Sequence, residues 1–428
     1  MLRRIAIYLS PLALIGVLAA FQPQDENTNL ADDTSLAELI EMLDGEAAAH
    51  QVKNLPGVSV EAGRMLVHEG IADDPDNPGN TRRQSKHFVS TSCHNTVKED
   101  PDLRYADPEA RLTYTSENGL PFLPGTTLFG VVNRRTFYNG DYEKKYGDLV
   151  RPARKDLRGA IALCATECAQ GRELADWEME SILAYLWTID IKLADLNIPE
   201  SSMAVIQKAV GGQGDKAAAR KVLESYYLDH SPATFLLPPP DRKEGYAEAG
   251  NATRGQLIYD GSCLHCHGER RYSFFNLDDS KYSFSFLEKH FPVYTRYSTY
   301  QVVRYGTSPT PGKRAYMPHY TKERMSDQQV EDLAEHHEQH HRRHFPPRHL
   351  VAPVEVVGHG AFADLLVEDG DDVGAGPDRQ DVPVTNRLRE PVKRPGYDER
   401  VDGEIETGIH HHQEQPPEPL HVGKDLCH

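Results

Sequence analysis

The chain has no excess of positive charge. Its 47 lysine and arginine residues are outnumbered by 65 aspartate and glutamate residues, which gives a formal net charge of −18. Nucleic acids are bound mainly through positive charge, so this balance excludes a nucleic-acid partner, whereas an acidic surface suits docking to basic proteins. At 428 residues the chain is also too long for one compact core, which usually takes about 100 to 200 residues. Two domains are therefore expected.

No cysteine directly follows the apolar segment near the N-terminus, which argues against a lipid-anchored lipoprotein. The segment itself is typical of an export signal, because Arg3 and Arg4 precede an apolar run from Ile5 to Phe21. Small residues around Ala19 offer cleavage sites, but the run is also nearly long enough to remain as a membrane anchor. Residues 1–24 are therefore predicted to be a signal peptide or anchor, which places the chain in the periplasm or facing it.

Cysteine is scarce, and only one pair has the spacing Cys-x-x-Cys. A structural zinc half-site is the alternative reading of that pair, and the absence of a second Cys-x-x-Cys argues against it. That pair lies in the segment Cys263-Leu264-His265-Cys266-His267. A c-type haem site needs two thiols that add across the haem vinyl groups and a histidine directly after the second thiol. Cys263 and Cys266 are predicted to attach haem c covalently, and His267 to be the proximal iron ligand.

Around this motif, residues 250–345 resemble the class I cytochrome c fold. In that fold a helix leads into the haem motif, a loop brings a methionine to the other haem face, and a final helix closes the core. The resemblance implies that Met317, in Tyr316-Met317-Pro318, is the distal ligand. Met325 is the rival, but it directly precedes Ser326, the expected N-cap of the closing helix. A histidine and methionine pair suits electron transfer rather than oxygen chemistry.

A second, incomplete motif reads Ser90-Thr91-Ser92-Cys93-His94, with serine where the first cysteine should stand. Three alternatives follow from it. A second haem is attached by one thioether through Cys93, or haem is held without that bond, or the site has lost its haem. In the first two cases His94 is the proximal ligand.

No histidine or methionine lies between Asn95 and Glu178 to serve as the distal ligand of this second site. Met179 falls on the apolar stripe of a helix and is expected in the core. Cys164 and Cys168 precede that helix in a pattern that resembles the sulfur-oxidation cytochromes, whose haem is ligated by histidine and thiolate. The resemblance implies Cys164 as the distal ligand. The alternatives are a disulfide between Cys164 and Cys168, or two small buried side chains.

The expected fold is mainly α, with two cytochrome c-like helical domains in tandem, at 58–199 and 250–345. A faint repeat supports this, because Gly63-Arg64-Met65-Leu66-Val67 precedes the first motif as Gly255-Gln256-Leu257-Ile258-Tyr259 precedes the second. Residues 25–57 are predicted to be a polar spacer with a short helix, and 200–249 a helical connector. The segment 346–428 lacks periodicity and is predicted to be a disordered tail.

Five histidines interrupt the apolar stripe of the closing helix. They are His336, His337, His340, His341 and His344. Their spacing could bind a transition metal, but a solvated histidine-rich run is favoured. Because the stripe breaks here, either a natural tail follows or the reading frame has shifted near Glu335.

The sequence thus predicts a c-type cytochrome that carries single electrons between redox partner proteins, and it favours a carrier over an enzyme. One alternative is a diheme enzyme that oxidises a sulfur compound such as thiosulfate, with a haem ligated by histidine and cysteine in the first domain. Another is a docking subunit of a larger redox complex.

Overall fold

The computed structural model describes residues 30–79, 82–295, 297–307 and 316–344, and within these ranges the chain is helical. No strand forms in the described part, where pairing is limited to two isolated bridges, Ser35 with Lys192 and Thr136 with His230. The predicted mainly α class is confirmed. The predicted signal at 1–24, the tail at 346–428 and Cys427 lie outside the described residues.

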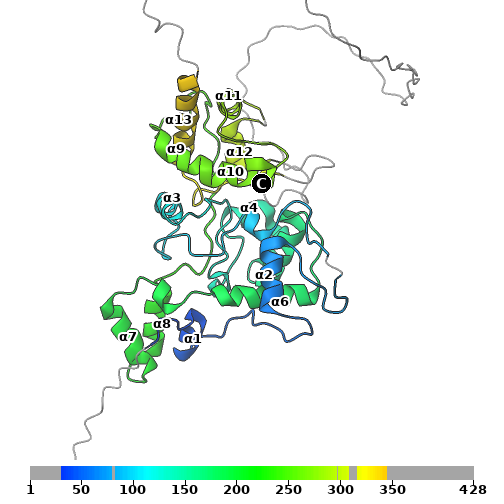
Figure 1. Cartoon of the computed structure of the whole chain (residues 1–428). Helices are drawn as coiled ribbons and strands as arrows, with labels where there is room; N and C mark the ends of the chain where they lie inside the picture. The colour runs from blue at the N-terminus through cyan, green and yellow to red at the C-terminus, as the bar shows by residue number, and fades with distance from the viewer. Residues whose placement is uncertain (1–29, 80–81, 296, 308–315, 345–428) are drawn as a thin grey trace, which may run out of the picture. The chain divides into compact units, whose positions relative to one another are not determined.

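The first helix pair consists of α2 (Val60–Glu69) and α6 (Asp176–Leu186), which cross in Figure 1. Ser59 caps α2 by accepting a hydrogen bond from the Ala62 amide. The two helices can approach closely because residue 63 is glycine, where a Cβ would lie 1.8 Å from the Ser181 carbonyl oxygen. Their buried faces form one core with α5 (Leu157–Leu163), made by Leu66, Val67, Leu157, Ala160, Ile182, Leu183, Tyr185 and Leu186 among others.

The second pair repeats this arrangement with α9 (Ala252–Ile258) and α13 (Asp327–His344). Here a Cβ on Gly255 would lie 1.9 Å from the Asp332 carbonyl oxygen. The short α10 (Leu264–His267), α11 (Lys281–His290) and α12 (Thr299–Tyr305) complete this part of the fold (Figure 1). The faint sequence repeat thus corresponds to the same local packing, a glycine against the backbone of a closing helix.

The prediction of a solvated histidine run is wrong for the first two histidines of α13, which are buried. His336 is 4% exposed and His337 is 1% exposed, and both rings contact Tyr259 and Phe284. The His340 ring stacks on Phe284, with 4.0 Å between the ring centroids. A neutral imidazole is flat and can pack as an aromatic ring does, so the buried face of α13 continues beyond Glu335. The broken stripe therefore gives no support to a shifted reading frame.

A third group of helices contains α1 (Leu36–Met42), α7 (Glu200–Val210) and α8 (Lys216–Glu224). They share a separate core, which includes Leu36, Leu39, Leu43, Ile206, Ala209, Ala219 and Leu223. The segments predicted to be a spacer and a connector therefore pack against each other.

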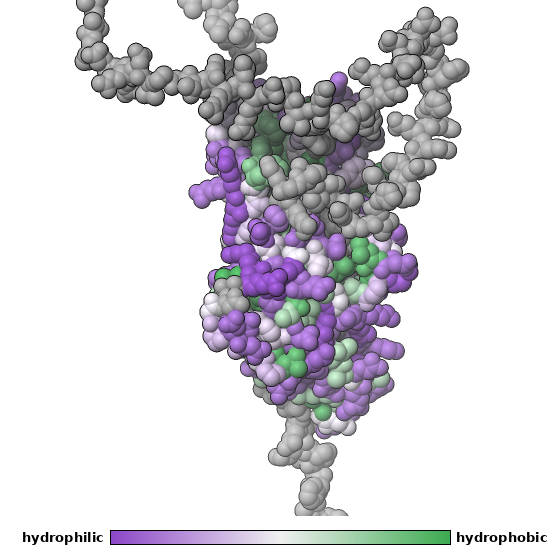
Figure 2. All heavy atoms as spheres, turned by 90° about the vertical axis from the view of Figure 1, so that its right-hand side faces the viewer, coloured by the Kyte–Doolittle hydropathy of each residue, from purple (hydrophilic) through white to green (hydrophobic). Residues whose placement is uncertain are grey.

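The remaining helices of the described residues are α3 (Pro108–Glu117) and α4 (Asp141–Tyr146). None of the helices in the described ranges is long and apolar enough to cross a bilayer. Figure 2 shows a face on which hydrophilic residues predominate and hydrophobic residues form small, separate patches. All described residues belong to one compact unit.

Candidate functional site

The Cys-x-x-Cys-His segment lies where the chain leaves α9. The helix widens into a π-helical turn over Tyr259–Cys263 and continues as α10, which ends at His267. Nδ1 of His267 lies 3.1 Å from the Phe275 carbonyl oxygen, which fixes the ring and leaves Nε2 for another partner. Burial lowers the pKa of His267, which favours the neutral imidazole that binds metals.

The two candidate methionines occupy different environments. Met325 is 1% exposed and part of the core around α9 and α13. Met317 is half-buried in a non-helical segment at the edge of the same core, together with Cys263 and Phe275. Its backbone is held by two hydrogen bonds with Thr307, of 2.8 and 2.9 Å. Met325 is thus a core residue, whereas Met317 lies in a non-helical segment, as the resemblance requires, at the edge of the core that Cys263 also borders.

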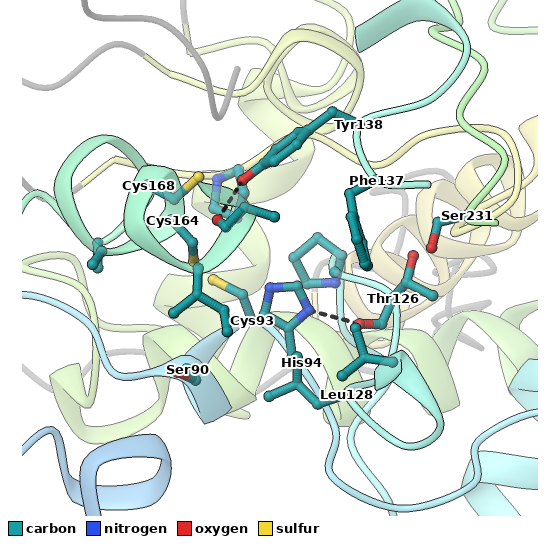
Figure 3. Close-up of a pocket in the computed structure, with 18 of the residues that line it drawn as sticks. Ser90, Cys93, His94, Thr126, Leu128, Phe137, Tyr138, Cys164, Cys168 and Ser231 are labelled. Atoms are coloured by element: carbon teal, nitrogen blue, oxygen red, sulfur yellow. Dashed lines mark hydrogen bonds between the residues drawn. The ribbon is translucent and has the colours of Figure 1, made fainter. Parts of the chain in front are cut away.

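The incomplete motif borders a cavity of about 270 Å³. Ser90, Cys93, His94 and Cys164 all line it, so the structure brings together the residues predicted for the second site. Figure 3 shows Cys93 and His94 reaching into the cavity on one side and Cys164 on another. Apolar side chains make up much of the remaining wall, among them Leu66, Val67, Leu128, Val131, Phe137, Leu157, Ile161 and Leu186. A site that is largely apolar with a few polar groups is typical of cofactor binding.

His94 is oriented in the same manner as His267. Its Nδ1 lies 2.7 Å from the Thr126 carbonyl oxygen, drawn as a dashed line in Figure 3. Gly125 makes this approach possible, because a Cβ there would lie 2.5 Å from the imidazole ring. Burial lowers the pKa of His94 and keeps the ring neutral. Both motif histidines therefore have Nδ1 against a backbone carbonyl, as histidines that ligate a metal usually do.

Cys164 lies at the end of α5, where a π-helical turn runs over Cys164–Cys168. It is a free thiol, so the alternative of a disulfide with Cys168 is wrong. Burial raises the pKa of Cys164 to about 11, so the thiol stays protonated at neutral pH unless a metal displaces its proton. Met179, which was expected in the core, is only half-buried on α6 and does not belong to the core cluster of that helix.

Sequence reasoning missed much of the cavity wall, including the four residues Arg134, Tyr316, His319 and Arg324. Tyr316 donates a 2.9 Å hydrogen bond to the Cys168 carbonyl oxygen, and its ring contacts Phe88. Three of the four come from the segment around Met317 and α13, more than 200 positions after Cys93. Tyr316 and His319 lie within two residues of Met317, and this proximity to a predicted ligand was the only feature of the sequence that pointed to them.

The two motif segments touch each other. Sγ of Cys266 lies 3.9 Å from the Ser92 carbonyl oxygen, and His265 hydrogen-bonds the backbone of Thr91. Ser262 donates a 2.7 Å hydrogen bond to the carbonyl oxygen of Phe122, whose own amide binds the Gly261 carbonyl oxygen. The two candidate sites are therefore immediate neighbours.

No family model, curated protein or solved structure matches the chain. Within the described ranges, no three histidine, cysteine, aspartate or glutamate side chains converge to hold a bare metal ion. The paired histidine and sulfur residues of the two motifs are suited to a cofactor that brings its own equatorial ligands.

Proposed function

We propose that the protein is a diheme c-type cytochrome that transfers single electrons, with two cytochrome c-like domains in tandem. The observation that carries the proposal is the matching environment of His94 and His267. Each follows a cysteine directly, and each has Nδ1 fixed by a backbone carbonyl so that Nε2 can bind iron. Haem c, when bound, supplies an iron that gains and loses one electron.

In the second site, Cys263 and Cys266 would attach the haem, His267 would hold the iron from one face and Met317 from the other. In the first site, Cys93 would form a single thioether and His94 would be the proximal ligand. The apolar wall of the cavity would exclude water from the porphyrin, and the fixed imidazole would keep its orientation when the iron changes charge.

The contact between the motif segments supports electron transfer within the molecule. Cys266 and Ser92 are in contact, and Tyr316 lines the first cavity while its neighbour Met317, the proposed distal ligand of the second haem, packs at the edge of the core that Cys263 borders. The proposed role is therefore to accept an electron at one haem and pass it to a redox partner through the other. The predicted export signal would place this activity in the periplasm or facing it, with the chain either free or tethered through its N-terminus.

A second candidate function is the oxidation of a sulfur compound such as thiosulfate at the first site. The observation that favours it is the free Cys164 thiol in the same cavity as His94. A thiolate ligand opposite His94 would match the haem of the sulfur-oxidation cytochromes. Reduction of the haems by added thiosulfate, lost in Cys164→Ala but retained in Thr166→Ala, a position of the same π-helical turn that does not line the cavity, would separate this enzyme from a pure carrier.

A haem count tests the proposal directly. The absorbance of the pyridine haemochrome per mole of protein should give two haems, and Cys263→Ala with Cys266→Ala should leave one. Ser90 lines the cavity beside Cys93, so Ser90→Cys should supply the missing thiol and shift the haemochrome maximum of the first haem to shorter wavelength. A count of one haem, with none remaining in the double variant, would contradict the first site. Retention of both covalent haems in the double variant would contradict the second.

A further inference from the structure

A cluster of buried charges lies beside the first cavity. Glu99 is completely buried, and its carboxylate lies 2.7 Å from Arg324 and 3.8 Å from Arg111. Burial alone would raise the pKa of Glu99, but the two guanidinium groups outweigh it and hold the pKa at about 2. Arg111 and Arg324 also donate to backbone carbonyl oxygens, including that of Leu123. Both guanidinium groups are thus paired with Glu99, although Nε of Arg111 has no hydrogen-bond partner among the described residues.

Arg134 adds a positive charge to the same cluster. It interacts electrostatically with Glu99 and Asp100, but no carboxylate among the described residues lies within ion-pair distance of it. Its hydrogen bonds go only to the carbonyl oxygens of Thr127, at 2.8 Å, and Phe129, at 3.5 Å. Burial lowers the pKa of Arg134 to about 10, which leaves it charged at neutral pH.

The charges of the cluster do not balance. Three guanidinium groups, of Arg111, Arg134 and Arg324, face two carboxyl groups, of Glu99 and Asp100. At pH 7 both carboxyls are ionised, since burial raises the pKa of Asp100 only to about 6, and three minus two leaves one positive charge. Arg134 is half-buried and has no carboxylate within ion-pair distance among the described residues, so an anion in the cavity would complete its charge pairing. Arg134 and Arg324 both line the cavity, which places the anion there.

We infer that Arg134 and Arg324 bind the propionate carboxylates of the haem in the first cavity. This rests on the proposed function, because it requires a haem attached at Cys93. Haem carries two carboxylates on the edge opposite its vinyl groups, and guanidinium groups pair with carboxylates through parallel hydrogen bonds. Arg324 lies just before α13, so a haem bound at the first motif would hold a segment of the second domain in place.

Arg134→Met in the full-length protein tests the assignment, because Arg134 bonds only to two carbonyl oxygens and its replacement leaves the Glu99 pairs intact. The neighbouring Arg135→Met is the matched control, since Arg135 is 57% exposed and pairs with Glu224 on the surface. Arg134→Met should lower the haem content of the first site or lower the reduction potential of its haem, because a positive charge favours the added electron. Arg135→Met should leave both at the wild-type value, and Arg134→Lys should restore much of the potential.

Three other results of the Arg134→Met experiment would overturn the inference, and one of them would also overturn the proposed function. Wild-type protein without haem at the first site would overturn the proposed function, and this inference with it. Wild-type protein with two haems whose first-site content and potential are unchanged in Arg134→Met would overturn this inference alone. A variant with unchanged haem that no longer responds to thiosulfate would assign Arg134 to an external oxyanion, which also overturns the inference.

Discussion

Met317 and Met325 are close in sequence, but the structure gives them different surroundings. We expect Met317→Ala to remove the sulfur-to-iron charge-transfer band of the second haem and to lower its reduction potential. Met325→Ala should instead leave the band in place and reduce the free energy of unfolding by about 2–5 kcal/mol, because it opens a cavity in the core. Absorption spectra and urea unfolding of both variants measure this. The opposite pattern would make Met325 the ligand.

At the scale of single residues, the sequence predicted what a short motif can encode. The assignment of Cys263, Cys266 and His267 to a haem site stays a prediction from spacing, whereas Cys93, His94 and Cys164 were predicted for one site and do line one cavity. The neighbours Arg134 and Arg324 could not be predicted, because they reach the cavity from distant segments. The buried histidines were misjudged because a hydropathy pattern counts imidazole as polar, whatever aromatic rings surround it.

The buried histidines of α13 make the stability of this helix depend on pH. Burial, with a smaller contribution from His340, lowers the pKa of His336 from 6.5 to about 4. Between these values the unfolded chain binds a proton that the folded chain does not, so stability is complete above pH 6.5 and is lost as the pH falls toward 4. We expect the urea midpoint to fall between pH 7 and pH 5.

Replacing His336 should reduce this dependence. His336→Phe keeps a flat ring but cannot be protonated, so its midpoint should change less between pH 7 and pH 5 than that of the wild type. His341→Gln is the control on the same helix, at a half-exposed position where the ring pairs with Glu288 at 2.9 Å. An equal pH dependence in the wild type and His336→Phe would exclude His336 as the cause.

The helix pairs α2 with α6 and α9 with α13 both have a glycine at the point where the helices cross. Gly255→Ala would place a methyl group against the Asp332 carbonyl oxygen and force α9 and α13 apart. We expect a loss of about 1–3 kcal/mol in the free energy of unfolding. Gly268→Ala is the control, because its φ is −62° and the nearest atom to a new Cβ is 3.8 Å away. Equal unfolding midpoints for the two variants would contradict close packing at this crossing.

The positions of helices along the chain were predicted better than the choice of which helices pack against each other. The apolar stripe of α6 and the first part of the α13 stripe arise from neighbours three and four residues apart, so local spacing is sufficient to predict them, whereas the histidine part of α13 was misjudged. The association of α1 with α7 and α8 joins segments more than 150 positions apart, and no local pattern carries that information.

At the scale of the whole molecule, Glu99 joins segments that are far apart in the sequence, because it pairs with Arg111 and with Arg324. Glu99→Gln would leave both guanidinium groups without a carboxylate partner. We expect a loss of about 3–5 kcal/mol in the free energy of unfolding, measured in urea. Asp102→Asn is the control, since its pair with Arg104 is on the surface and should contribute less than about 1 kcal/mol. A Glu99→Gln variant as stable as Asp102→Asn would contradict this role.

The contact between Cys266 and Ser92 has a consequence for how the proposed haems would fill with electrons. Charges separated by protein rather than by water repel each other strongly, so an electron on one iron would make the addition of the next less favourable. The two proposed haems would then be reduced anticooperatively. The state that holds one electron in total would be populated over a wide range of potential.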